Sequence, residues 1–310
     1  MIRWQRQGRL FSLPKVHSFG KTHMQLPIIH RLSSGEFELF FSTRNKENVA
    51  FGGLLRFQSL QNPNPYFEQQ PVIVPGKLGA FDDMGVMPSS VVDVDGDTYL
   101  YYIGWNVRNT VPYHNSIGLA IKQKGTGFFE KISEGPIIER TYKEPYFNGT
   151  NSVMKEGNIW RMWYLSCTGW QMIDGKPEAN YLVRYAESKN GIDWVREGQI
   201  CIDYDSENEA IAGASVIKFQ DKYIMMYSLR NTRDYRQNPD HSYHLRFAES
   251  QDGLTWVKQP NNIWERESFA AWENQMQAYP NLFIADDKLM MFYNGNGFGQ
   301  TGIGLAQAML

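Results

Sequence analysis

The sequence lacks the features of disulfide-stapled secreted domains, membrane proteins and nucleic-acid-binding proteins. It has two cysteines in 310 residues, too few for a disulfide scaffold and without the spacing of a zinc site. No run of 18 apolar residues occurs, and the amino terminus is charged where a secretory signal would be apolar. The formal net charge of −2 provides no basic surface for nucleic acid. We therefore expect a folded cytoplasmic protein that inserts into no membrane and binds no nucleic acid.

Aromatic residues are abundant, at 14% of the chain, which favours β-structure. One pattern occurs five times: a β-rich run, a turn containing Gly, Asp or Asn, and then an aromatic run. The repeats are about 60 residues long, with steps of 61, 62, 63 and 65 residues between the aromatics taken as equivalent, namely Phe41, Tyr102, Tyr164, Tyr227 and Phe292.

A second signature follows each copy, as in YLVRYAESKNGIDWVRE and HLRFAESQDGLTWVKQ, where an alternating strand leads through a Gly-containing turn to another strand. Each repeat therefore contains four strands. The sequence predicts an all-β fold, a five-bladed β-propeller of four-stranded antiparallel blades that forms one domain over residues 1–310. The last copy ends after its third strand, and the amino-terminal IRWQRQGRLF is similar to the fourth-strand text DWVREGQICI. We expect the amino-terminal strand to join the last blade and close the ring.

Three phrases, YAESKNGIDWV, GAFDDMGVMPSSVV and YNGNGFGQTGIGLA, make the chain resemble the five-bladed propeller enzymes of the arabinanase, levansucrase and invertase superfamily. These are glycoside hydrolase families 43, 32 and, more loosely, 130. The resemblance covers the whole chain and is strongest for a subgroup associated with bacterial polysaccharide gene clusters. It implies the propeller fold and a sugar substrate, whereas the reaction stays open because one fold hosts many functions.

Carboxylates are expected in a central cup, where inner strands begin and second strands end. Glycosidic chemistry generally needs one acid to protonate the leaving oxygen and one carboxylate to act as nucleophile or base. The catalytic candidates come from three blades and are Asp82, Asp83, Glu209 and Glu273. Glu207 is the alternative to Glu209. The FDDMGVMP phrase is similar to the superfamily's active-site segment. The alternative is that these residues are turn residues that bond their own backbone.

The first blade departs from the family pattern. The family's hydrolases carry an Asp at the start of that blade's inner strand, and here Gln25 takes its place, with His23 two residues earlier. The missing carboxylate weakens the case for simple hydrolysis. His23 is a candidate base or phosphate ligand, against the alternative of a structural histidine.

Arginines are the second group of candidate residues expected in the cup. Arg44 and Arg230 have equivalent places in blades 1 and 4, and guanidinium groups suit a charged substrate such as a sugar phosphate or nucleotide sugar. The alternative is that they pair with the cup's own acids. The predicted substrate-binding residues are His23, Gln25, Arg44, Trp105, Asn151, Arg230, Tyr279 and Asn294.

Three functions are open at this point. The leading hypothesis is a glycosidase-like enzyme that acts at the anomeric centre of a sugar. The second is a cytoplasmic enzyme that rearranges or transfers a nucleotide sugar during polysaccharide assembly, such as a pyranose–furanose mutase. The third is a carbohydrate-binding propeller without catalysis. No metal or cofactor is expected, because phosphate-binding Gly loops, dinucleotide fingerprints and zinc spacings are absent. The sequence carries no prediction of oligomeric state.

Overall fold

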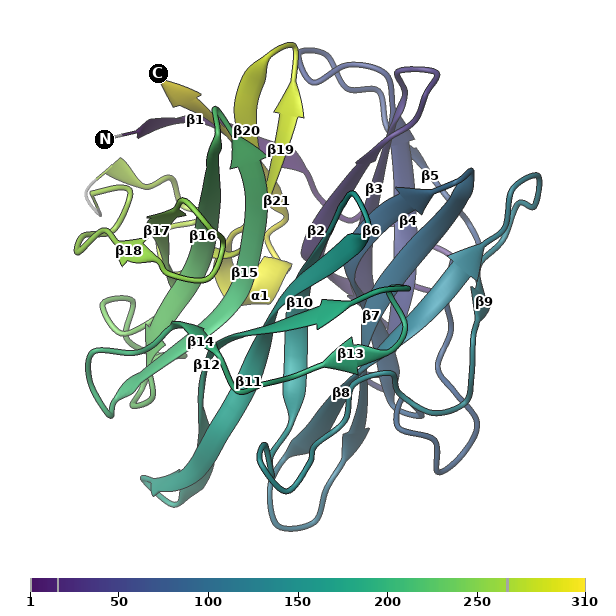
Figure 1. The fold of residues 1–310 in the computed structure, drawn as a ribbon. Helices are drawn as coiled ribbons and strands as arrows, with labels where there is room; N and C mark the ends of the chain where they lie inside the picture. Colours follow the sequence, from purple (N-terminus) through teal and green to yellow (C-terminus); the bar gives the residue numbers. More distant parts are fainter. Residues whose placement is uncertain (1, 16, 266–267, 310) are drawn as a thin grey trace.

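The computed structural model describes residues 2–15, 17–265 and 268–309, and these are folded almost entirely into β-strands (Figure 1). The all-β class predicted from the sequence is confirmed. In the described part of the chain no helix is long and apolar enough to cross a membrane.

The strands form four sheets, one of which has eight strands and includes a parallel bridge between β4 and β6. Dividing the eight-stranded sheet at this bridge gives five antiparallel units, which we number along the chain. Unit 1 contains β2 (Thr22–Arg31), β3 (Phe37–Arg44), β4 (Ala50–Phe57) and β5 (Tyr66–Phe67). Unit 2 contains β6 (Gly85–Val94), β7 (Asp97–Val107), β8 (Tyr113–Lys122) and β9 (Glu130–Lys131). Unit 3 contains β10 (Asn148–Glu156), β11 (Ile159–Ile173), β12 (Lys176–Ser188), β13 (Trp194–Val195) and β14 (Ile200–Ile202). Unit 4 contains β15 (Glu209–Phe219), β16 (Lys222–Asn231), β17 (His244–Ser250) and β18 (Val257–Lys258).

Unit 5 combines the two ends of the described chain. Its strands are β19 (Ala278–Ala285), β20 (Lys288–Asn294), β21 (Ile303–Met309) and β1 (Arg3–Phe11), with the short helix α1 (Asn296–Gly299) between β20 and β21. β1 pairs antiparallel with β21 from Arg3 opposite Met309 to Phe11 opposite Ile303, and both ends of the chain lie together in Figure 1. The predicted partner of the amino-terminal strand is therefore the observed one.

Local sequence explains the hairpins and the central strands. The DVDGD segment turns between β6 and β7 with positive φ at Asp95 and Gly96, as a two-residue hairpin requires. β16 is buried along most of its length rather than on alternate residues, because neighbouring units cover both faces of its sheet.

Apolar clusters lie between neighbouring units and supply the core. One cluster joins each of the pairs 1 and 2, 2 and 3, 3 and 4, and 4 and 5, and another joins unit 5 to unit 1. In the last of these, Phe283 and Phe292 of unit 5 share a cluster with Phe37 and Phe41 of unit 1. The core is thus divided among the interfaces, so no unit buries its apolar faces alone.

Side-chain hydrogen bonds connect the inner strands of successive units. The hydroxyl of Ser90 accepts the backbone N–H of Val153 in the next unit, at 3.0 Å. Ser152 and Ser215 repeat this contact one unit further on each time, and the Asn281 Oδ1 atom accepts the N–H of Ile29, which links unit 5 to unit 1 at 2.9 Å. Units 1 and 2 are joined instead by a parallel bridge from Ala50 to Gly85.

The inner strands β2, β6, β10, β15 and β19 surround one small central cavity of about 30 Å³. That volume holds roughly two water molecules. A sugar ring does not fit inside it.

Candidate functional site

The backbone is strained where the inner strands of units 1 and 5 begin, at one end of the central cavity. His23, Leu26 and Tyr279 have positive φ values of 66°, 57° and 52°. This left-handed region costs a residue with a side chain roughly 1–2 kcal/mol. Tyr279 occupies the strand-bulge position that Gly213 fills in unit 4. A tyrosine at a position where only glycine is unstrained strains the backbone. Such strain occurs at binding sites.

An aromatic cluster lies at the same end of the molecule. The Tyr279 ring is 6.1 Å from the Tyr243 ring, and Tyr113 packs edge-on against Trp170 at 5.4 Å. Tyr113 and Tyr279 also contact the apolar cluster that contains Trp105, which links the aromatic residues of units 2 and 5. Exposed faces of such rings suit stacking on the apolar face of a sugar.

Asp82, one of the four catalytic candidates, lies in a buried ion pair. Its Oδ2 atom is 2.5 Å from Lys131 Nζ and accepts the Tyr102 hydroxyl at 3.2 Å. The side chain is almost completely buried, and its partners belong to the second and fourth strands of unit 2. The Asp82 carboxylate is thus held between two strands of its own unit.

Glu273 has the same surroundings in unit 5. Its carboxylate accepts the Tyr293 hydroxyl at 2.6 Å and lies 2.7 Å from Arg6 Nη1 on the fourth strand. The carboxylate is buried, whereas Arg6 keeps part of its surface in solvent. Glu273 therefore anchors β1 to the body of unit 5.

Unit 3 contains a third copy of this arrangement, which sequence reasoning missed. Glu144 accepts the hydroxyls of Tyr164 and Ser166 at 2.9 Å, and Arg196 Nη1 lies 3.5 Å from it. In each copy the acid precedes its tyrosine by 20 residues, and an aromatic-x-basic phrase supplies the cation: FEK, WVR or WQR. We call this arrangement the acid–tyrosine–base cluster. It also corrects the repeat alignment, because Tyr293 rather than Phe292 is the equivalent of Tyr102.

Glu209 lies beside the corresponding tyrosine of unit 4. Its Oε2 atom accepts the backbone N–H of Asp205 at 2.8 Å. Burial raises the pKa of Tyr227, and the carboxylates of Asp205 and Glu209 raise it further, which places both acids near that ring. Glu207, the alternative candidate, is exposed to solvent.

Asp83 is the candidate carboxylate with the fewest partners. Its Oδ2 atom accepts the N–H of Gly79 at 3.0 Å, while its Oδ1 atom is buried and has no hydrogen-bond partner. No ion pair involves Asp83 within the described chain. The next residue, Met84, packs against the cluster that contains Trp105.

His23, Gln25, Arg44 and Tyr279 come together between units 1 and 5. Burial lowers the pKa of His23, and Arg44 lowers it further, to about 4, so the imidazole is neutral at pH 7. Burial raises the pKa of Tyr279, although a hydrogen bond with Gln25 and the charge of Arg44 oppose the shift, and its phenol stays protonated. The Arg44 guanidinium also lies 5.9 Å from the Trp105 ring centre. Four predicted binding residues are thus neighbours.

Arg230 is enclosed by tyrosines, and each of its three nitrogens is hydrogen-bonded to the protein. It is 1% exposed, and its Nε atom donates to the hydroxyls of Tyr181 and Tyr243 at 2.8 and 3.2 Å. Its other nitrogens donate to the backbone oxygens of Asn231 and Ala179 at 3.0 Å. Arg230 therefore orients the tyrosines that carry the aromatic cluster.

Asn294 has a structural place as well. Its Oδ1 atom accepts the Leu26 N–H at 2.9 Å, and its Nδ2 atom donates to the oxygens of Met24 and Gly302 at 2.6 and 3.3 Å. The side chain is completely buried. These bonds tie β20 to β2 and account for both polar atoms.

Buried amide oxygens without a donor mark the inner-strand starts. Gln25 Oε1, Asn148 Oδ1 and Asn151 Oδ1 are buried and accept no hydrogen bond within the described chain. Asn151 also lines the central cavity. A buried acceptor without a donor costs about 1–3 kcal/mol, so a ligand or water that donates there is favoured.

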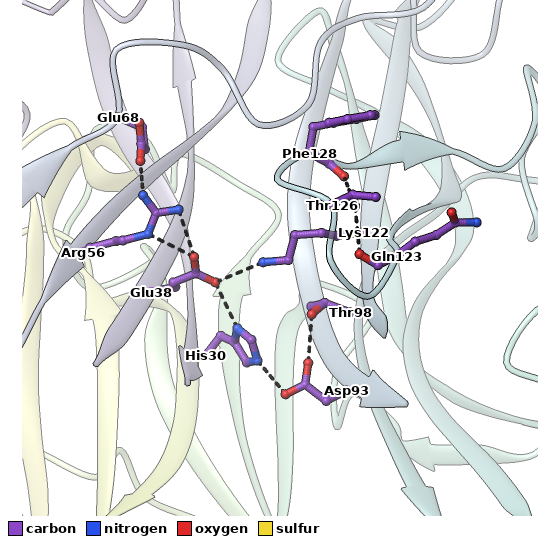
Figure 2. Close-up of polar contacts among 10 residues, drawn as sticks. All are labelled: His30, Glu38, Arg56, Glu68, Asp93, Thr98, Lys122, Gln123, Thr126 and Phe128. Carbon is purple, nitrogen blue, oxygen red and sulfur yellow. Dashed lines mark hydrogen bonds and ion pairs between the residues drawn. The ribbon is translucent and has the colours of Figure 1, made fainter. Parts of the chain in front are cut away.

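A second charged network lies away from the cup, at the other end of β2 (Figure 2). His30 bridges two carboxylates, with Nδ1 3.1 Å from Glu38 and Nε2 2.8 Å from Asp93 of unit 2. Arg56 and Lys122 also approach Glu38, at 3.1 and 3.7 Å. Burial would lower the pKa of His30, but the two carboxylates more than offset it and raise the pKa. In the described residues no group of three or more His, Cys, Asp or Glu side chains is placed to hold a metal ion.

Two relatives match over nearly the whole chain. The uncharacterized proteins MT1551 and Rv1502 of Mycobacterium tuberculosis are each 31% identical over 307 residues, which covers 98% of this chain and 99% of theirs. No family model matches the sequence.

Solved structures share the fold at low sequence identity. An RGII complex of the protein BT0996 has a TM-score of 0.75 at 16% identity, and the match covers 97% of this chain and 90% of that one. A glycoside hydrolase has a TM-score of 0.76 at 15% identity, with the same coverage. Sucrose-6-phosphate hydrolase from Lactobacillus gasseri has a TM-score of 0.64 at 10% identity and covers 93% of this chain and 60% of that one. At these identities the likeness establishes the fold.

Proposed function

The chain belongs to the family of MT1551 and Rv1502 and has the fold of the propeller glycoside hydrolases, and we propose that it is a five-bladed propeller enzyme acting on a sugar in the cup. The proposed closed ring is supported by the apolar clusters and side-chain bonds that join successive units, unit 5 to unit 1 included. Solved structures with this fold include hydrolases of sugars.

The unpartnered amide oxygens are the observation that carries the sugar proposal. Sugars present hydroxyl donors on their edges and an apolar face, so buried acceptors beside aromatic rings match both features. Gln25 and Asn151 supply the acceptors, and the strained Tyr279 and Trp105 supply the rings. Because the central cavity is too small for a ring, the sugar would rest on these residues at the strand starts.

Asp83 and His23 are the proposed proton-transfer groups. Asp82 and Glu273 are each held by a cation and a phenol, which leaves Asp83 as the candidate carboxylate with a buried, unpartnered oxygen. In this proposal Asp83 exchanges a proton with the glycosidic oxygen. The neutral His23 imidazole, whose Nε2 atom lies 3.2 Å from the Gln300 amide nitrogen, accepts a proton from the attacking hydroxyl or water once the ligand displaces that amide. A single free carboxylate differs from the usual carboxylate pair of glycosidases.

The ion pairs of Asp82 and Glu273 favour one second candidate, a carbohydrate-binding protein without catalysis. A binding protein would use the same amide oxygens and rings but would leave the ligand unchanged. Turnover therefore separates the two candidates, whereas binding alone does not.

The test is to incubate the protein with a panel of aryl glycosides and oligosaccharides and to measure released sugar. We expect turnover that Asp83→Asn lowers by about a hundredfold, which is the usual contribution of a positioned acid or base. Asp286→Asn, in the exposed β19–β20 hairpin, is the matched control and should leave the rate unchanged. Full activity in Asp83→Asn would remove this residue from the mechanism, and binding without turnover would favour the second candidate.

A further inference from the structure

Arg44, which is half-buried, differs from the buried Arg230 because no protein group balances its charge. Its Nη1 atom donates to Asn48 Oδ1 at 2.8 Å, and its Nε atom is buried without a partner. No carboxylate of the described chain lies within 4 Å of it, whereas Arg230 has every nitrogen hydrogen-bonded to the protein. Arg44 therefore keeps both a free donor and an uncompensated positive charge.

The groups around Arg44 do not neutralise it. His23, Tyr279 and Trp105 are its neighbours, and none carries a negative charge at pH 7. Burial itself lowers the pKa of Arg44, which reports that the charged form is poorly solvated. A half-buried guanidinium without a counter-charge is unfavourable unless a ligand supplies one.

The carboxylates that would have balanced Arg44 are held elsewhere. Asp82 pairs with Lys131, Glu273 pairs with Arg6, and Glu209 lies beside Tyr227 of unit 4. Gln25, which is hydrogen-bonded to Tyr279 in this region, is neutral. The region between units 1 and 5 therefore carries a net positive charge.

We propose that the sugar bound in the cup carries an anionic group, a carboxylate or a phosphate, and that Arg44 pairs with this group. The inference rests on the proposed function, because the same amide oxygens and rings hold the sugar. A guanidinium presents its donors in a planar fork that suits either anion. The unpartnered Nε–H of Arg44 is the donor that such a pair would use.

Calorimetric titration with matched ligands tests the substrate class. Glucose, glucuronate and glucose 6-phosphate differ in the charged group, so they compare a neutral sugar, a carboxylate and a phosphate. We expect at least one of the two anions to bind about tenfold or more tightly than glucose. Arg44→Gln should abolish this preference, while Arg31→Gln, at the exposed far end of β2, should keep it. Equal affinity for neutral and acidic sugars, or an unchanged preference in Arg44→Gln, would overturn the proposal.

A probe without a sugar separates this inference from the proposed function. Titrating His23 by NMR in the presence of inorganic phosphate measures the charge at Arg44 directly. Phosphate paired with Arg44 should raise the pKa of His23 from about 4, and Arg44→Gln should raise it without phosphate. If phosphate produces this shift and none of the sugars binds, the anion site stands and the sugar proposal fails. If phosphate leaves the His23 pKa unchanged, Arg44 does not hold anions.

Discussion

Unit 1 and the other units share one strand plan but bury their charges in different places. Units 2, 3 and 5 each contain the acid–tyrosine–base cluster. In unit 4, Asp205 lies near Tyr227 and pairs with Lys258. Unit 1 has Phe41 at the tyrosine position and Phe67 at the place of the basic residue. Its charges are instead the network around His30 at one end and the unbalanced Arg44 at the other.

This difference separates the structural charges from the candidate functional ones. A carboxylate that recurs with the repeat, at a fixed distance from a tyrosine and a basic residue, belongs to the scaffold. His23, Gln25 and Arg44 have no counterparts in such a cluster, and they lie where the backbone is strained. In this repeat protein, absence from the recurring cluster is therefore a better guide to a binding site than charge as such.

The strongest way to break the comparison is to remove an acid from a cluster. Glu273→Ala leaves Arg6 and Tyr293 without their partner, and breaking a buried pair in this way costs about 3–5 kcal/mol. Because Arg6 is partly exposed, we expect a loss near the lower end of that range, measured as a lower denaturant midpoint. Glu47→Ala, an exposed acid of unit 1, should change stability by less than about 0.5 kcal/mol. A Glu273→Ala protein as stable as the parent would refute the structural role.

Tyr293→Phe tests the hydroxyl of the cluster alone. The phenol donates to a buried carboxylate at 2.6 Å, and hydrogen bonds to charged groups contribute about 1.5–3 kcal/mol. We expect a loss of that order in equilibrium unfolding. The variant keeps the ring and removes only the hydroxyl, so an unchanged unfolding curve would show that the ion pair suffices.

Phe41→Tyr makes unit 1 resemble its neighbours at one position only. The added hydroxyl would be buried in the cluster between units 5 and 1 and would find no acid, since Lys21 stands 20 residues before it. An unsatisfied buried hydroxyl costs about 1–3 kcal/mol. The same group is thus expected to stabilise unit 5 and destabilise unit 1, and thermal unfolding of the two variants compares them directly. A stabilised Phe41→Tyr protein would contradict the assigned difference.

The smallest expected effect concerns the His30 network. The folded-state pKa of His30 is raised above 6.5. The contribution of His30 to stability is therefore full below pH 6.5 and is lost as the pH rises through the folded-state pKa. Burial would raise the pKa of Glu38, but His30, Lys122 and Arg56 lower it to about 2, so its contribution is full above pH 4.5 and falls in acid. The network should therefore stabilise most between pH 4.5 and 6.5.

His30→Gln checks this window. We expect a destabilisation of about 1 kcal/mol or less that is greatest inside the window and shrinks as the pH rises, measured by urea unfolding at several pH values. His17→Gln supplies the contrast, because burial lowers the pKa of His17 and the dependence should run the other way. A pH-independent difference for His30→Gln would show that the imidazole contributes only by packing.

The periodicity of the sequence was enough to predict the strands of each repeat and the pairing of β1 with β21. The residues that specify the strands recur in every copy, and strand pairing depends on this local pattern. The alignment slipped by one residue in unit 5, at Phe292, because two adjacent aromatics satisfy the same pattern. The hydrogen bond of Tyr293 to Glu273 resolves the register, and only a three-dimensional contact could do so.

The candidate site was less readable. Asp82 and Asp83 are neighbours in sequence, yet one pairs with Lys131 and the other has a buried free oxygen, because successive residues in a turn face different ways. The sequence did contain a signal for the structural member: the 20-residue spacing to Tyr102 and the basic residue of FEK. The tyrosines around Arg230 had no such signal, since Tyr181 lies on β12 and Tyr243 just before β17, and they meet Arg230 only after folding.

The serine and asparagine contacts between inner strands have a consequence for how the protein meets a ligand. Each fixes the backbone of one unit to a side chain of the previous one before anything binds. The inner strands therefore lose little conformational entropy when a ligand binds. The affinity should depend on how well the ligand fits their rigid shape. Discrimination between sugars that differ by one hydroxyl should follow, because stiff walls cannot adjust to the wrong one.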